Sequence, residues 1–165
     1  MIIKCVDSYG TLVKIPEREL RGADLSGLEL HRALLQNADL QGSLAVDANM
    51  RGAFLQWANL ADANFSGANL ITADVWHAHC RGASFSGAKM RGVVAEHASF
   101  VRADLSGADV CGGTFKNANF VDAICDFSEY DESDFEGAIF SEDTKFPPGF
   151  DPIAHGFTLV TDRSS

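Results

Sequence analysis

A five-residue repeat is the feature of this sequence that most limits how the chain can fold. Every position divisible by five from 20 to 140 carries an apolar residue, usually Leu, Phe, Met or Val, which makes twenty-five repeats in one register. The residue two positions earlier is Ala in eighteen of the twenty-five, and Gly occurs eleven times two positions later. The unit therefore reads Ala, Asp or Asn, Leu or Phe, any residue, Gly.

A period of five indicates a chain that turns at regular intervals. The α-helix has a period of 3.6 and the β-strand a period of 2, so neither produces this pattern. If the large residue and the Ala two positions before it both point inward, as on an extended segment, the other three positions face solvent or form a corner. Gly and Asn supply the backbone freedom that a corner needs. We expect the Asp and Asn residues before each central position to be exposed or to hydrogen-bond at the corner.

Runs such as ADLSG, ANFSG, ANLIT and ADLSGADV resemble the pentapeptide repeat family, over about three quarters of the chain. The resemblance implies an all-β fold, a right-handed quadrilateral β-helix in which four pentapeptides make one coil of a solenoid. Residues twenty apart would then lie one above the other. About six coils, each about 4.8 Å from the next, would form the rod.

The repeats leave room for a cap at each end, because an open solenoid exposes apolar surface and strand edges. We divide the chain into an N-terminal cap (1–15), the pentapeptide repeat β-helix (16–142) and a C-terminal cap and tail (143–165). The first cap contains two short strand-like runs, MIIKCV and TLVKI, typical of a hairpin or two cap strands. In the second, Asp151 before Pro152 predicts the N-cap of a short helix, followed by an apolar strand.

The cysteines and the hydropathy predict a cytoplasmic protein. Four cysteines are too few and too scattered for a disulfide framework, so we expect free thiols in a reducing compartment. Cys80 and Cys125 fall on central positions and should be small buried apolar residues, whereas Cys111 should face outward. No stretch approaches the length that a membrane span needs, and we expect no membrane contact.

No catalytic residue, cofactor site or metal site is predicted. The chain lacks a Walker-type loop, a dinucleotide glycine motif, Gly-x-Ser-x-Gly and His-Glu-x-x-His, so we do not expect an enzyme. The net charge of −10 argues against nucleic acid as a direct partner, because phosphate binding requires clustered Lys and Arg.

The twenty-residue stacking predicts one outward cluster that contains both tryptophans, and we call it the aromatic surface. Within it, Trp57, His77 and His97 should form a single column. Such a cluster is typical of contact with another protein or of self-association, but stacked rings could also only cover the neighbouring backbone. His77, His79 and His97 should lie close together, but we do not predict a zinc site because no outward Cys or acid completes a ligand set. The aromatic surface consists of Leu34, Phe54, Trp57, Trp76, His77, Val94 and His97.

The last repeats are strongly acidic. Nine acids and no Lys or Arg lie between Val121 and Asp143, which leaves fourteen acids against thirteen bases elsewhere. These acids could keep the rod soluble and prevent end-to-end stacking, or they could meet a basic groove on a partner. The acidic end, as named below, consists of Asp122, Asp126, Glu129, Asp131, Glu132, Asp134 and Glu136.

Two functions follow from the resemblance. The first is a non-catalytic protein–protein interaction scaffold whose target is unknown. The alternative is DNA mimicry: some family members resemble DNA in width and charge, bind DNA gyrase or topoisomerase IV, and protect from quinolones or gyrase toxins. This sequence departs from that group because its repeats are uninterrupted by projecting loops and its negative charge is gathered at one end. The scaffold is therefore the preferred prediction.

Overall fold

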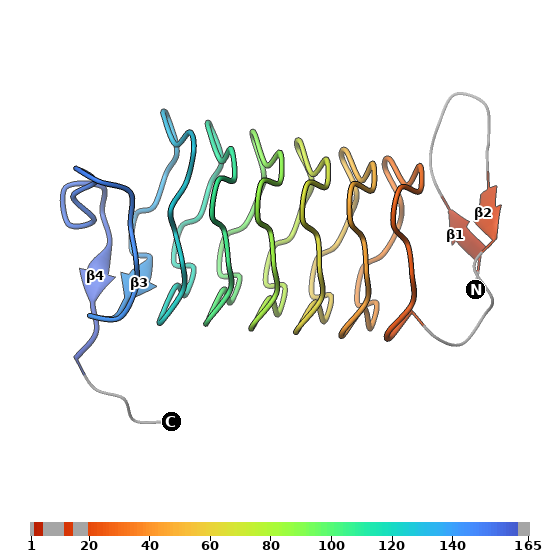
Figure 1. Ribbon diagram of the computed structural model, residues 1–165, viewed down its shortest axis with the longest axis horizontal. Coiled ribbons are helices and arrows are strands. Elements are labelled where there is room, and N and C mark those ends of the chain that lie inside the picture. The colour runs from red at the N-terminus through yellow and green to blue at the C-terminus, as the bar shows by residue number, and fades with distance from the viewer. Residues whose placement is uncertain (1, 5–11, 15–19, 162–165) are drawn as a thin grey trace.

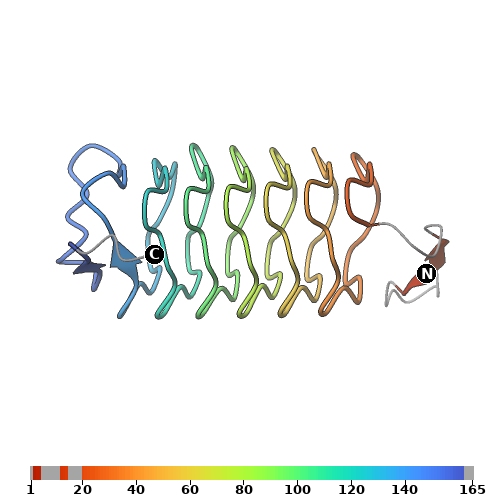
Figure 2. The same ribbon diagram turned by 90° about the horizontal axis from the view of Figure 1, so that it is seen from below.

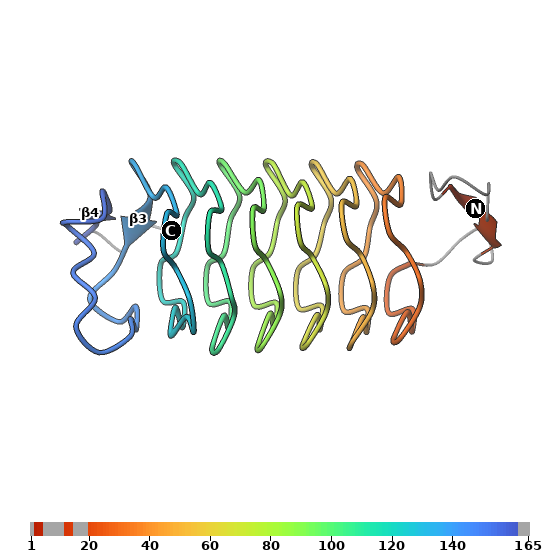
Figure 3. The same cartoon turned by 90° about the horizontal axis from the view of Figure 1, so that it is seen from above.

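The computed structural model describes residues 2–4, 12–14 and 20–161. From residue 20 the chain winds into a straight stack of coils (Figure 1), and the two views turned by 90° show the same regular spacing (Figures 2 and 3). Each coil pairs with the next through parallel bridges between residues twenty apart, from Asp24 with Leu44 to Asn119 with Ile139. The predicted repeat of four pentapeptides per coil is therefore confirmed.

Apolar side chains at the central positions fill the inside of the stack. All of these positions from Leu20 to Phe140 are buried except Tyr130, which is half-buried, and the alanines two positions earlier are mostly buried with them. Phenylalanines twenty apart stack on one another, with ring centroids 5.1 Å apart for Phe100 and Phe120 and 5.2 Å apart for Phe115 and Phe135. The interior is thus a continuous apolar column, as the pattern predicts.

The corners use the left-handed backbone conformation two residues after each central position. From position 22 to 137 every such residue has a positive φ near 60°, glycine or not, except Phe127. A glycine adopts this conformation without strain, whereas the other residues are held in it by hydrogen bonds to the next coil, such as Arg32 N–H to Arg51 O at 2.8 Å. The side chain one position before the centre braces the corner: Asp24 Oδ1 accepts from the Ser26 N–H at 3.0 Å, which confirms the expected corner hydrogen bond.

Phe127 interrupts the corner pattern, although the sequence register continues through it. Its ring is buried, only 4% exposed, and stacks on Phe135 with centroids 5.8 Å apart. The chain turns tightly here, since the Phe127 N–H donates to Cys125 O at 2.7 Å. Turning an apolar ring inward removes it from water, which explains why this corner differs from the rest.

The N-terminal segment contains the two expected strands. β1 (Ile2–Lys4) and β2 (Leu12–Lys14) pair antiparallel, with Ile3 opposite Val13. The boundary between this cap and the repeats lies outside the described residues and stays a prediction.

At the C-terminal end the expected strand forms and the expected helix does not. β3 (Ile139–Phe140) pairs in parallel with β4 (Thr158–Leu159). Asp151 Oδ1 accepts from the N–H groups of Ile153 and Ala154 as a helix cap would, but 152–156 form successive turns. Gly156, with φ of 89°, reverses the chain, so that the Phe157 ring packs on Phe135 with centroids 4.8 Å apart. Burial of Phe157 ends the segment before a helix can extend.

The described residues contain no helix that could span a bilayer.

Candidate functional site

The aromatic surface contains a stacked column of three rings. Trp57 and His77 stack with centroids 4.1 Å apart and planes within 4°, and His77 and His97 stack at 4.8 Å and 9°. All three residues occupy equivalent corners with positive φ, which makes their side chains project in the same direction from successive coils. The single column predicted from the twenty-residue period is therefore present.

Trp76 packs against the side of this column. Its ring meets Trp57 edge-on at 5.2 Å and 84°, and meets His77 edge-on at 4.2 Å and 88°. Such edge contacts are a favourable geometry for aromatic pairs. Trp57 remains 47% exposed, while Trp76 and His77 are half-buried. The two tryptophans thus form one cluster with an open outer face.

The other apolar members of the aromatic surface, Leu34, Phe54 and Val94, come from a neighbouring position of each coil. Leu34 bridges to Phe54, Phe54 to Asp74, and Asp74 to Val94. The sequence reasoning missed Asp74, the acid between Phe54 and Val94. Its place twenty residues after Phe54 could have revealed it. Asp74 accepts a hydrogen bond from Gln56 Nε2 at 2.6 Å, so its charge is held by a neighbouring amide.

The fold favours the neutral form of the His77 ring. Partial burial lowers the pKa of His77 below its ordinary value, and the charges of His97 and His79 lower this pKa further. The described part of the chain holds no group of three or more His, Cys, Asp or Glu side chains that could bind a metal. The arrangement therefore favours contact through ring faces and edges.

The acidic end is partly neutralised by bases of the preceding coil. Lys116 Nζ lies 3.0 Å from Asp134 and 3.1 Å from Glu136, and Arg102 lies 3.7 Å from Asp122. The pKa of Asp134 is lowered first by the backbone N–H of Glu136 and then by Lys116. The other four members are exposed and form no ion pair with any described residue: Asp126, Glu129, Asp131 and Glu132.

The described cysteines agree with their predicted places. Cys80 and Cys125 are buried and Cys111 is half-buried, and all three are free. Burial raises the pKa of the Cys80 and Cys125 thiols, which keeps both protonated and unreactive.

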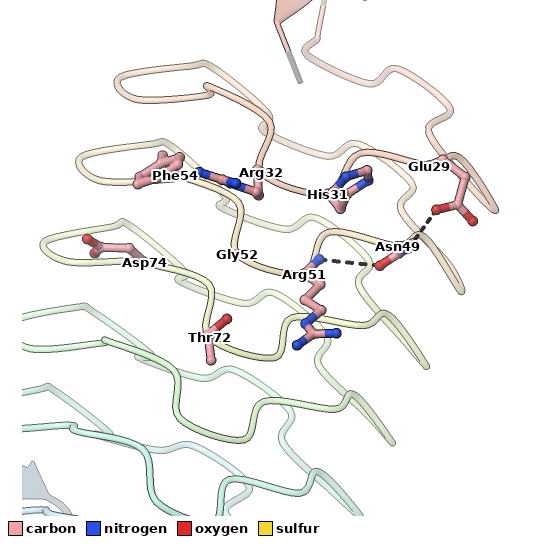
Figure 4. Close-up of a pocket in the computed structure, with 9 residues that line it drawn as sticks. All are labelled: Glu29, His31, Arg32, Asn49, Arg51, Gly52, Phe54, Thr72 and Asp74. Carbon is pink, nitrogen blue, oxygen red and sulfur yellow. Dashed lines mark hydrogen bonds between the residues drawn. The ribbon is translucent and has the colours of Figure 1, made fainter. Parts of the chain in front are cut away.

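A cleft beside Phe54 is a second surface feature, which the sequence reasoning missed. Its lining comes from three consecutive coils, so its members are about twenty residues apart in sequence (Figure 4). The sequence signal that could have indicated the cleft is Gly52, a corner glycine that lies twenty residues after Arg32 and twenty residues before Thr72. The cleft is lined by Glu29, His31, Arg32, Asn49, Arg51, Gly52, Phe54, Thr72 and Asp74.

Comparison with solved structures shows the same fold in other proteins. HetL, a pentapeptide repeat protein involved in heterocyst differentiation regulation from the cyanobacterium Nostoc sp. strain PCC 7120, is 23% identical with a TM-score of 0.59. The match covers 76% of this chain and 62% of HetL, so the chain spans less than two thirds of that protein. Rfr23, a pentapeptide repeat protein from the cyanobacterium Cyanothece 51142, is 19% identical with a TM-score of 0.57, over 76% of this chain and 88% of Rfr23.

A lower similarity is found to QnrB1, a plasmid-mediated fluoroquinolone resistance protein. It is 18% identical over 85% of this chain and 91% of QnrB1, with a TM-score of 0.37. No curated protein sequence matches the chain.

The sequence profile of the family described as Pentapeptide repeats matches residues 19–52, 45–76 and 78–117, with eight copies. These matches cover more than half of the chain and coincide with the regular coils. Proteins of this family are generally non-catalytic structural or interaction scaffolds. The chain therefore belongs to the pentapeptide repeat family, and its fold is the right-handed quadrilateral β-helix.

Proposed function

We propose that this protein is a non-catalytic scaffold that binds another protein through the aromatic surface. The observation that carries the proposal is the ring cluster on one side of the rod, where Trp57 is 47% exposed above the column of His77 and His97. Tryptophan is among the residues most enriched at the energetic centres of protein interfaces. Leu34, 39% exposed, adds aliphatic area to the same surface.

The solenoid backbone supports this use of the rings because it holds them in place before a partner arrives. Their corners are hydrogen-bonded to the next coil, as when Trp57 N–H donates to Trp76 O at 3.0 Å. Side chains that are already ordered lose little conformational entropy on binding, so more of the contact energy appears as affinity. The same stacking would also cover the backbone in the absence of a partner, and the experiment must separate these two roles.

The proposal is tested by comparing the wild type with Trp57→Ala and with Leu44→Ala. Leu44 is the matched control, since it is an apolar residue with a similar exposure of 45% at another position of the coil. Each purified chain is immobilised and its retained proteins are identified, and any candidate is then titrated as a pure protein by calorimetry. We expect a partner that binds the wild type and Leu44→Ala but not Trp57→Ala. Equal retention by all three chains would rule out the aromatic surface as the interface.

Self-association through the aromatic surface is measured on the same three chains by sedimentation velocity. A dimer that forms with the wild type and Leu44→Ala, and is lost in Trp57→Ala, would identify the partner as a second copy. Thermal unfolding of the three chains provides the necessary control, because a large loss of stability in Trp57→Ala alone would indicate a structural role for the ring.

A second candidate function is binding to DNA gyrase or topoisomerase IV as a DNA mimic, without direct contact to nucleic acid. The four exposed acids that have no ion pair with a described residue favour it, while the pairing of Asp122, Asp134 and Glu136 with bases weakens it. A supercoiling assay with added protein, with and without ciprofloxacin, tests it. Inhibition of supercoiling, or rescue from the drug, would support mimicry, and neither effect is expected if the scaffold proposal is right.

We propose the cytoplasm as the location of the protein. The free thiols of Cys80, Cys111 and Cys125 support a reducing compartment. Fractionation of cells that express the full-length protein tests this, and recovery in a membrane or extracellular fraction would contradict it.

A further inference from the structure

We propose that the cleft beside Phe54 is a binding site for an anionic group, a carboxylate or a phosphate, that is attached to an apolar or aromatic group. The cleft shares Phe54 with the aromatic surface, but the inference rests on the cleft's own residues and does not depend on the proposed protein-binding role. The cleft has a volume of about 710 Å³, which falls within the range of roughly 300–1000 Å³ common for small-molecule sites.

The cleft exists because a corner side chain is missing at Gly52. A Cβ atom added there would lie 3.4 Å from Arg32 Cγ and 3.8 Å from Thr72 Oγ1, so a side chain at this position would extend into the space between the two. Equivalent corners carry Arg32 in the coil before and Thr72 in the coil after. The floor of the cleft is therefore backbone, flanked on either side by a longer side chain.

Two guanidinium groups, of Arg32 and Arg51, line the cleft and are not paired with a described acid. Neither Arg32 nor Arg51 forms an ion pair with a described residue, whereas Arg91, two coils further at the position of Arg51, lies 3.3 Å from Asp109. In Figure 4, Arg32 extends toward Phe54, and Arg51 extends along the rod toward the coil that carries Thr72. Their donors are thus available to a bound anion.

The two acids of the cleft are already engaged by amides. Glu29 accepts from Asn49 Nδ2 at 2.5 Å, and Asp74 accepts from Gln56 Nε2 at 2.6 Å. Figure 4 shows these acids at opposite ends of the lining, with the arginines between them. The middle of the cleft is therefore its most positive part.

The donor geometry and the aromatic wall together define the class of ligand. A guanidinium presents a planar fork of N–H donors that matches the oxygens of a carboxylate or a phosphate, and it stays charged at any physiological pH. Phe54 is half-buried and offers an apolar surface to the rest of the molecule. The hydroxyl of Thr72 donates to Ile71 O at 2.7 Å, and the two arginines are the permanently charged donors of the lining.

The test is an NMR titration of the full-length protein at low ionic strength with inorganic phosphate, phenyl phosphate and phenylacetate. We expect saturable shifts of the backbone amide signals of Gly52 and Thr72, with phenyl phosphate binding more tightly than inorganic phosphate. Arg51→Gln should weaken binding about fivefold, the upper end of what an exposed charge pair contributes. Phe54→Ala should abolish the advantage of the phenyl group and leave the binding of inorganic phosphate unchanged.

Arg81→Gln is the matched control, since Arg81 is also exposed and forms no ion pair with a described residue. Binding of phenylacetate and phenyl phosphate alike would identify a carboxylate or phosphate site, and binding of the phosphates alone would identify a phosphate site. Shifts that do not saturate, or an equal effect of Arg81→Gln and Arg51→Gln, would overturn the proposal. None of these results depends on Trp57, so this inference and the proposed function can fail separately.

Discussion

Substitution of Gly113 by the alanine that is typical of the repeat is expected to destabilise the protein. Gly113 is buried at a position where eighteen of twenty-five repeats have Ala, and its φ is not in the left-handed region. By the repeat pattern alone, Gly113→Ala would stabilise the fold by about 0.4–1 kcal/mol, because alanine restricts the unfolded chain. The packing around this position predicts the opposite sign.

A Cβ atom at position 113 would lie too close to three neighbours. It would be 2.8 Å from Phe115 Cε2, 2.9 Å from Val110 O and 3.1 Å from Val93 Cγ1. Val93 occupies the same inward position one coil earlier, where most repeats have Ala. The extra volume of the Val93 side chain is therefore accommodated by the missing side chain at Gly113. Overpacking of a core costs about 1–3 kcal/mol, and subtracting the gain from alanine at the middle of both ranges leaves a net loss of about 1–2 kcal/mol.

Ser43→Ala provides the matched control at the same position of the repeat. Ser43 is fully buried, and its Oγ has no hydrogen-bond partner in the described structure. Removal of a buried hydroxyl without a partner should stabilise the protein by about 1 kcal/mol. The two changes to alanine are thus expected to have opposite signs.

Thermal unfolding followed by circular dichroism, with urea midpoints as a second measure, tests both variants. For a chain of this size 1 kcal/mol corresponds to a shift of about 2–4 °C, so Gly113→Ala should unfold about 2–8 °C below the wild type. The sign of the shift is the quantity compared, because stacked coils need not unfold in one step. If Gly113→Ala unfolds at or above the wild-type midpoint, the packing argument is refuted. Val93→Ala added to Gly113→Ala should recover part of the loss.

Three other predictions follow from the core, the ring column and the thiols. Phe100→Ala should lower the free energy of unfolding by about 3–5 kcal/mol because the ring is fully buried. This free energy is measured by urea unfolding, and a decrease of less than about 1 kcal/mol would contradict the prediction. Because the pKa of His77 is lowered in the fold, the unfolded state binds its proton more tightly, and stability should fall as the pH drops below about 6.5. Thermal unfolding across that pH should show a smaller loss for His77→Phe, and equal losses would disprove the assignment. Iodoacetamide should label Cys111 in the folded protein and Cys80 only after unfolding, as measured by peptide mass spectrometry, whereas early labelling of Cys80 would contradict its burial.

Much of the aromatic surface could be predicted because residues twenty apart in sequence lie one above the other on successive coils. Trp57, His77 and His97 are twenty apart, so the period alone places them in one column, and the ring contacts agree. The edge-on place of Trp76 and the hydrogen bond that holds Asp74 depend on side-chain conformation, which periodicity does not contain. The cleft was missed for a related reason, since it depends on a side chain that is absent at Gly52 and on two arginines that find no acid.

The amino-acid pattern is enough to predict the period, the inward residues, the corner residues and the register of twenty between coils. Each of these follows from a local rule that every pentad repeats, so one repeat predicts the next. The places where that rule fails become visible only in the folded chain: the inward turn of Phe127, the turns around Gly156 in place of a helix, and the size match of Val93 with Gly113. These depend on the volume left by neighbouring coils, and such volumes arise only when side chains from several coils are packed together.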